Sequence, residues 1–222
     1  MGKSVTVVIP SLNEAAGIRD SILSIGNNGY EIIVVDGASK DGTASIAKEA
    51  GAKVIIEPKR GYGRAYKTGF DAASGEIIAA TDADHTYPNE RIAELAKHFQ
   101  EKGLDFLSTN RFHRLEPGSM SFMNKFGNRV LSLTSRLLFS VPFEDSQSGM
   151  WLISKDAWDR IKGRISSDGM AFSQEIKIEA FRSRLKCGEI GIEYRRRHGE
   201  AKLNRIRDGL GNLFSLFQKR FS

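Results

Sequence analysis

The stretch Val5-Thr6-Val7-Val8-Ile9-Pro10-Ser11-Leu12-Asn13-Glu14 begins as an apolar, β-branched run and turns polar at Ser11. Short β-branched runs predict strands, and an unbroken apolar run predicts a strand buried on both faces, as in parallel sheets. The polar residues that follow would then lie at the carboxyl end of the strand. Four such runs are Val5 to Ile9, Glu31 to Val35, Lys53 to Ile56 and Glu76 to Thr81.

Helical patterns separate these strands along the first hundred residues. The alternation predicts an α/β fold with a doubly wound, mostly parallel central sheet and helices on both of its faces. In such sheets, ligands bind beyond the carboxyl ends of the strands. The expected helices span Ala15 to Ile25, Thr43 to Glu49, Gly63 to Ala73 and Asn89 to Glu101.

Length and composition limit the possible architectures. With 222 residues, we expect one domain over residues 1–204 and a basic amphipathic helix over residues 205–222. The single cysteine, Cys187, excludes an internal disulfide framework and a cysteine-based zinc site. No apolar stretch approaches the roughly 20 residues of a spanning helix, and the N-terminus begins with a strand pattern. We therefore expect no transmembrane segment.

Basic and apolar residues are interleaved in two segments of the second half. In residues 119–142, Lys125, Arg129 and Arg136 stand among apolar side chains, and Arg205 to Phe221 repeats the mixture. Such helices can lie on a membrane surface. The net charge of +6 is also concentrated toward the end of the chain, which favours an anionic partner. The residues concerned are Arg195, Arg196, Arg197, Lys202, Arg205, Arg207, Lys219 and Arg220.

Two aspartates, Asp82 and Asp84, follow the fourth predicted strand. If the strand continues, both carboxylates point to the same side, where they would suit a divalent cation such as Mg²⁺ or Mn²⁺. The alternative is a pair of solvated turn aspartates. Asp36 follows the second strand and could accept hydrogen bonds from a ribose or base, whereas Asp41 and Ser39 more often cap a following helix.

The segment Gly61-Tyr62-Gly63 suggests a phosphate loop only superficially. Tyr66 stands where a dinucleotide fingerprint needs its third glycine, and Lys67 lacks the preceding glycine of a P-loop. Lys59 and Arg60 are plausible phosphate contacts, and equally plausible surface charges.

Three segments together resemble the inverting family 2 glycosyltransferases: residues 8–14, residues 34–43 and Asp82-Ala83-Asp84. Within that family, Asp145-Ser146-Gln147-Ser148-Gly149 and residues 197–203 are similar to the dolichol-phosphate mannose synthase group. The resemblance implies a GT-A fold with amphipathic helical segments on the acceptor side. Gly37 and Thr86 depart from the pattern, because many members carry a second aspartate at the first position and the mannose synthases often carry glutamine at the second.

The resemblance also assigns site residues. The expected catalytic residues are Asp84, Asp145 and Arg129, with Asp82 and Asp84 holding Mg²⁺ or Mn²⁺. The expected nucleotide-sugar contacts are Pro10, Asn13, Glu14, Asp36, Lys59, Asp82 and Gln147. The expected contacts of the acceptor phosphate are Arg111, Arg129, Ser132, Arg195 and Arg197.

The function implied is transfer of a hexose, with mannose favoured, from a nucleotide-diphosphate sugar such as GDP-mannose to dolichol or polyprenyl phosphate. We expect inversion at the anomeric carbon and a peripheral location on the cytoplasmic membrane face. One alternative is a UDP-sugar donor, glucose or N-acetylhexosamine, with a lipid or soluble sugar acceptor. Another is a nucleotide- or nucleic-acid-binding protein without enzymatic activity, favoured by the basic run from Arg195 to Arg207. Asp82 and Asp84 oppose nucleic acid as a partner, because without a bound metal they would repel a polyanion.

Overall fold

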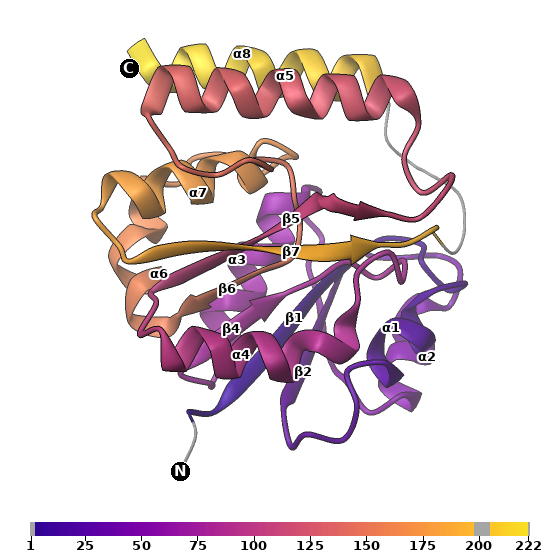
Figure 1. Ribbon diagram of the computed structural model, residues 1–222. Helices are drawn as coiled ribbons and strands as arrows, with labels where there is room; N and C mark the ends of the chain where they lie inside the picture. The colour runs from indigo at the N-terminus through magenta and orange to yellow at the C-terminus, as the bar shows by residue number, and fades with distance from the viewer. Residues whose placement is uncertain (1–2, 198–204, 222) are drawn as a thin grey trace.

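The computed structural model describes residues 3–197 and 205–221, and within them seven strands form one sheet in the order β3-β2-β1-β4-β6-β5-β7 (Figure 1). β6 runs antiparallel to both of its neighbours, while the other pairs are parallel. The strands are β1 Val5–Ser11, β2 Glu31–Asp36, β3 Lys53–Ile56, β4 Ile77–Ala80, β5 Phe106–Leu115, β6 Trp151–Ser154 and β7 Cys187–Tyr194.

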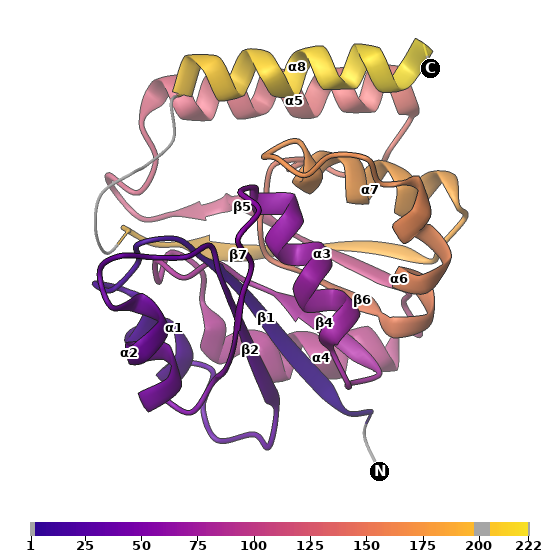
Figure 2. The ribbon, with the colours of Figure 1, turned by 180° about the vertical axis from the view of Figure 1, so that it is seen from behind.

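Helices cover both faces of the sheet (Figures 1 and 2), which confirms the predicted α/β architecture. The helices are α1 Ile18–Leu23, α2 Thr43–Glu49, α3 Tyr62–Ala72, α4 Ile92–Glu101, α5 Phe122–Phe139, α6 Lys155–Ile161, α7 Phe172–Arg182 and α8 Arg205–Phe221, with short 3₁₀ turns η1 Asn89–Arg91 and η2 Lys162–Arg164.

Two apolar cores lie on opposite sides of the sheet, because successive strand residues point to opposite faces. In β1, Val8 packs with α3, α6 and α7, whereas Val7 and Ile9 pack with α1, α2 and α4. This explains why β1 is apolar at nearly every position.

Some boundaries differ from the expected ones. The first helix is shorter than Ala15 to Ile25, because the N–H groups of Gly17 and Ile18 donate to Glu14 O and close a turn before α1 begins. The last expected helix of the first half starts as η1 and continues as α4. The basic amphipathic stretch forms α5, where Ser121 Oγ accepts a hydrogen bond from the Asn124 N–H and Ser140 adopts a left-handed φ of 56° after the last turn.

α5 and α8 lie side by side over one end of the molecule (Figures 1 and 2). Leu216 of α8 is buried in the same core as α3, α6 and α7. Lys219 forms ion pairs with Glu175 and Glu179 of α7, at 2.7 and 3.0 Å. The predicted boundary at residue 204 falls in residues 198–204, outside the described part of the chain. Within the described residues, no helix combines the length and apolar character needed to cross a bilayer.

Helix α3 approaches the sheet closely at Gly69. A Cβ atom there would lie 2.3 Å from Val8 Cγ1 and 3.0 Å from Val35 Cγ2. We expect Gly69→Ala to lower the free energy of unfolding by about 1–3 kcal/mol, because α3 must move off β1 and β2. The midpoint of urea-induced unfolding measures this.

Gly127 of α5 is the matched control, because a Cβ atom there meets nothing within 4 Å. Gly127→Ala should raise the free energy of unfolding by roughly 0.5–1 kcal/mol through helix propensity alone. Equal effects of the two substitutions would contradict the close packing of α3.

Candidate active site at the strand ends

The loops after β1 and β2 are hydrogen-bonded to each other. Asp36 is buried, and its carboxylate accepts hydrogen bonds from Ser11 Oγ at 3.2 Å, the Ser39 N–H at 2.8 Å and Ser39 Oγ at 2.6 Å. Asn13, with a left-handed φ of 51°, donates its N–H to Ser39 Oγ and accepts from the Lys40 N–H. These loops form one preorganised wall, on which the predicted nucleoside contacts lie.

Asp41 forms hydrogen bonds at the start of α2. Its carboxylate accepts hydrogen bonds from the N–H and Oγ1 of Thr43, the first residue of the helix, and from the Ala15 N–H. Burial is the largest single effect and raises the pKa of Asp41, but the hydrogen bonds together lower that pKa below its ordinary value. Ser39, in contrast, contacts Asp36 and Asn13 rather than α2.

Asp82 lies beyond β4 against two tyrosines of α3. Its Oδ1 accepts hydrogen bonds from the hydroxyls of Tyr62 at 3.0 Å and Tyr66 at 3.3 Å. Burial, reinforced by repulsion from Asp84, raises the pKa of Asp82 to about 7, despite the opposing effects of Tyr62, Arg197 and Arg111. A carboxyl in these surroundings differs from the solvated turn aspartate considered as the alternative.

Asp84 is buried and uses its two oxygens differently. Oδ1 accepts hydrogen bonds from the N–H and Oγ1 of Thr86, at 3.1 and 2.6 Å. Oδ2 lies 3.0 Å from Nη1 of Arg197, whose Nη2 bonds Glu14. Among the described residues, no group of three or more His, Cys, Asp or Glu side chains is placed to hold a metal ion.

Arg111 and Asp145 form a buried ion pair. The N–H, Nε and Nη2 of Arg111 donate to Asp145 at 3.1, 2.7 and 2.9 Å. Burial alone would raise the pKa of Asp145, but Arg111 and Lys177 lower it overall. The guanidinium also lies 5.4 Å from the ring centroid of Tyr194.

The loop from Asp145 to Gly149 is held by residues that the sequence did not identify. Lys177 of α7 is buried and donates to the carbonyls of Ser146 and Ser148, at 3.1 and 2.8 Å. Burial lowers the pKa of Lys177 to about 7. Lys177 lies within an ordinary helical pattern, so nothing in the sequence indicates that its side chain is buried. Tyr62 and Tyr66 could have been noticed, because they are one helical turn apart directly after Gly61.

Gln147 links this loop to α7 and α8. Its Nε2 donates to Gln174 Oε1 at 2.8 Å, and its Oε1 accepts from Asn212 Nδ2 at 3.0 Å. Gln174 in turn donates to Asn212 O and Ser215 Oγ. The loop is therefore attached to the helix that lies beside α5.

Four of the predicted site residues have other surroundings. Arg129 is exposed on α5, 5.5 Å from the ring centroid of Phe112. Ser132 is buried and accepts the Ser146 N–H. Arg195 forms ion pairs with Glu90 and Glu193, and Lys59 is exposed with its N–H bonded to Glu57. The structure thus gathers Glu14, Asp36, Asp82, Asp84 and Arg197 around the strand ends, with Pro10 and Asn13 in the adjoining loop.

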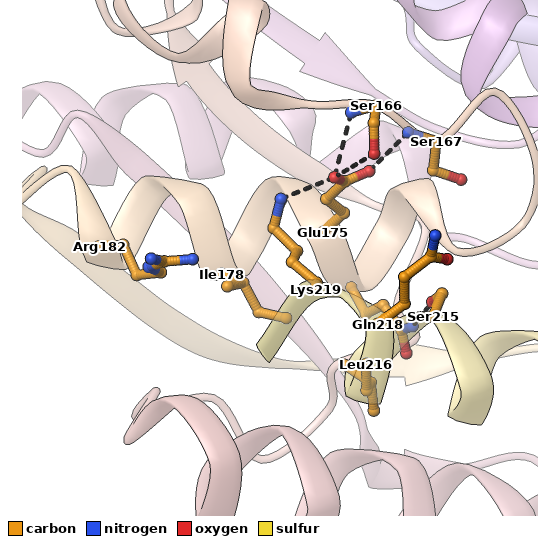
Figure 3. A pocket seen from close by; sticks show the side chains of 10 residues that line it. Ser166, Ser167, Glu175, Ile178, Arg182, Ser215, Leu216, Gln218 and Lys219 are labelled. Atoms are coloured by element: carbon orange, nitrogen blue, oxygen red, sulfur yellow. Dashed lines mark hydrogen bonds and ion pairs between the residues drawn. The ribbon is translucent and has the colours of Figure 1, made fainter. Parts of the chain in front are cut away.

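Two cavities lie outside this group of residues. One, of about 290 Å³, lies between α7 and α8, and Figure 3 shows Glu175 at its wall, bonded to Ser166, Ser167 and Lys219. The other, of about 320 Å³, is lined by residues of β5, β7 and the loop before Asp145, including Asn110 and Glu144. Neither is lined by Asp36, Asp82 or Asp84.

Residues 6–161 match the model of glycosyl transferase family 2, and the chain belongs to this family. Among its relatives is the low-salt glycan biosynthesis hexosyltransferase Agl6 of Haloferax volcanii, 35% identical over 213 residues. The match covers 93% of this chain but only 51% of Agl6, so the chain spans about half the length of that relative. A dolichyl-phosphate hexose transferase of the same organism is 28% identical, with 91% of this chain and 88% of that protein covered.

Solved structures have the same fold. Glucosyl-3-phosphoglycerate synthase from Mycobacterium tuberculosis, in complex with Mn²⁺, UDP and glucosyl-3-phosphoglycerate, gives a TM-score of 0.79 at 21% identity, over 99% of this chain and 80% of that one. The predicted family and the predicted GT-A fold are both confirmed.

Removing Asp145 should destabilise the fold strongly. Asp145→Ala leaves the Arg111 guanidinium buried without its carboxylate, and we expect a loss of about 3–5 kcal/mol in the free energy of unfolding. Glu90→Ala removes one partner of the more exposed Arg195 and should cost less than about 1 kcal/mol. Chemical denaturation of both variants measures the difference. Similar losses would show that the buried ion pair contributes no more to the free energy of unfolding than the exposed one.

Asp82→Asn should change the pH dependence of stability. Since the pKa of Asp82 is about 7 in the fold and its ordinary value is 3.8, the wild type loses stability as the pH rises through this range. The asparagine variant lacks that loss, so its stability relative to the wild type should rise by roughly 4 kcal/mol from about pH 4 to about pH 8. Denaturation without divalent ions tests this, and a pH-independent difference would contradict it.

Proposed function

We propose that the chain transfers a hexose, with mannose favoured, from a nucleotide-diphosphate sugar to a dolichol or polyprenyl phosphate with inversion. The observation that carries the proposal is the position of three carboxylates. Asp36, at the end of β2 and hydrogen-bonded to the loop that follows it, lies at the same carboxyl ends of the strands as Asp82 and Asp84. Family membership and the names of the relatives, a hexosyltransferase and a dolichyl-phosphate hexose transferase, support it.

The wall formed by the loops after β1 and β2 would bind the nucleoside. Asp36 is fixed by Ser11 and Ser39, so its remaining lone pairs are oriented before the ligand arrives. Pro10, Asn13 and Glu14, from the neighbouring part of the chain, would contact the same nucleoside. Lys59 would contact the diphosphate, and Gln147 the sugar.

The residues present fit a divalent cation, Mg²⁺ or Mn²⁺. Burial raises the pKa of Asp82, repulsion from Asp84 raises it further, and a cation between the two carboxylates would relieve that repulsion. Hard carboxylate oxygens are suitable ligands, and phosphate and water oxygens would complete the shell. The bound ion would supply positive charge to the departing diphosphate. The solved glucosyl-3-phosphoglycerate synthase complex contains Mn²⁺ and UDP.

A phosphate acceptor makes a strong general base unnecessary, because its second pKa is about 6. A phosphate oxygen forms the new bond to the anomeric carbon while the bond to the nucleoside diphosphate breaks on the opposite face. Arg111, Arg129 and Arg197 would hold the acceptor phosphate, with Ser132 and Arg195 as further candidates. Asp145 receives three hydrogen bonds from Arg111, so its role in this proposal is to position that arginine.

The exposed faces of α5 and α8 would lie on the cytoplasmic face of a membrane. Contiguous exposed apolar surface marks sites of membrane or protein contact. Lys125, Arg129 and Arg136 of α5 add the positive charge that favours anionic lipid. The exposed apolar residues of the two helices are Phe122, Met123, Phe126, Val130, Leu133, Leu137, Leu210, Phe214, Phe217 and Phe221.

A second candidate is a UDP-sugar donor with a soluble phosphorylated acceptor. The structural similarity to the glucosyl-3-phosphoglycerate synthase complex with UDP favours it. Incubation with labelled GDP- and UDP-sugars, Mn²⁺, short polyprenyl phosphates and a soluble phosphorylated acceptor such as phosphoglyceric acid, followed by extraction into organic solvent, separates the two. An aqueous product would favour the soluble acceptor.

Asp84→Asn should reduce metal-dependent transfer at least about 100-fold, because the charge is lost where the cation would bind. The amide oxygen can still accept the hydrogen bonds from Thr86, and Arg197 keeps Glu14 as a partner, so the variant should fold with a moderately lower unfolding midpoint. Turnover of the wild type with EDTA is the matched control. Near-normal turnover of either sample would refute the metal role.

Phe126→Ser combined with Phe214→Ser should weaken sedimentation with vesicles of phosphatidylcholine and phosphatidylglycerol by about tenfold or more, since each substitution removes roughly 1.5–3 kcal/mol of apolar burial. Leu23→Ser, at an exposed apolar position of α1, should leave vesicle binding unchanged. Equal binding of all three proteins would exclude this face as the membrane contact.

A further inference from the structure

Arg197 joins two of the strand-end loops. It follows β7, and its guanidinium lies between Glu14 of the loop after β1 and Asp84 of the loop after β4. The Glu14 and Asp84 side chains are only 12% and 8% exposed, so this pair of contacts is more desolvated than ordinary surface ion pairs. Within the described part of the chain, Arg197 Nε is buried with no hydrogen-bond partner.

The neighbouring arginines do not share this arrangement. Arg195 pairs with Glu90, and Arg196 donates to the Pro117 carbonyl while lying 3.9 Å from Glu116. The position between Glu14 and Asp84 therefore belongs to Arg197 specifically and does not follow from the basic character of the segment.

The oxygen that Arg197 contacts is the one that a cation would need. Asp84 Oδ1 already accepts two hydrogen bonds from Thr86, which leaves Oδ2 as the less engaged ligand atom. Arg197 Nη1 lies 3.0 Å from that atom. A divalent cation and a guanidinium on the same oxygen would repel each other strongly, because both are positive and only a few ångströms apart.

We propose that Arg197 is an internal counter-ion of the donor site that makes substrate binding ordered. In the ligand-free chain it forms ion pairs with both Glu14 and Asp84. Binding of the divalent cation with the nucleotide displaces the guanidinium, which is then available to an acceptor phosphate. This inference rests on the proposed function, and it adds an order in which donor and metal bind before the acceptor.

The test measures Mn²⁺ binding directly, through the electron paramagnetic resonance signal of the free ion and without nucleotide or turnover. Arg197→Gln should bind Mn²⁺ about fivefold or more tightly than the wild type, the lower end of typical coupling between sites. Arg196→Gln removes an equal charge next to it and should leave the affinity unchanged. Unchanged or weaker binding by Arg197→Gln would overturn the inference.

A second variant guards against misfolding. Arg197→Lys keeps the charge but loses the two-pronged contact, so its Mn²⁺ affinity should lie between those of the wild type and Arg197→Gln. Thermal unfolding of each variant shows whether it is folded. If Arg197→Gln does not fold, an Arg197→Lys affinity equal to that of the wild type overturns the inference.

Calorimetry with farnesyl phosphate tests the order. The wild type should bind this acceptor more tightly once Mn²⁺ and GDP or UDP are present, and Arg197→Gln should lose that dependence. If the wild type binds Mn²⁺ but Arg197→Gln behaves identically in both experiments, only this inference fails. If no protein binds Mn²⁺ with or without nucleotide, the proposed metal site fails and the inference fails with it.

Discussion

Negative charge gathered at one edge of the sheet is the constraint on which the rest of this structure depends. Parallel strands end on the same side, so Asp36, Asp82 and Asp84 are brought near one another by topology alone. The three carboxylates differ in how far their charge is compensated. Asp36 is satisfied by serine donors and Asp84 by Thr86 and Arg197, whereas Asp82 faces tyrosines and keeps a raised pKa. An uncompensated charge remains where the proposed cation would bind.

Much of the fold could be predicted from sequence because the first four strands are continuous β-branched runs separated by helical patterns. The antiparallel insertion of β6 could not, since Trp151–Ser154 is only four residues long and its place between β4 and β5 depends on long-range pairing. Family resemblance supplied the GT-A topology that local patterns lacked.

For the site, position directly after a strand was sufficient to single out Asp36, Asp82 and Asp84. The ion pair between Arg111 and Asp145 could not be predicted from the sequence, because the two residues are 34 positions apart. The sequence also gave no reason to separate Arg195 from Arg197, although acidic partners from different elements direct them to different places. Lys177 was missed because a buried lysine and an exposed one look alike within a helical pattern.

A ring of hydrogen bonds among Gln147, Gln174 and Asn212 attaches α8 to the loop after Asp145. Exchange of terminal helices between family members would therefore change the contacts of this loop as well as the surface offered to a membrane. A transplanted helix without a matching amide group would leave Gln147 without its Asn212 contact, so this helix and that loop are expected to diversify together.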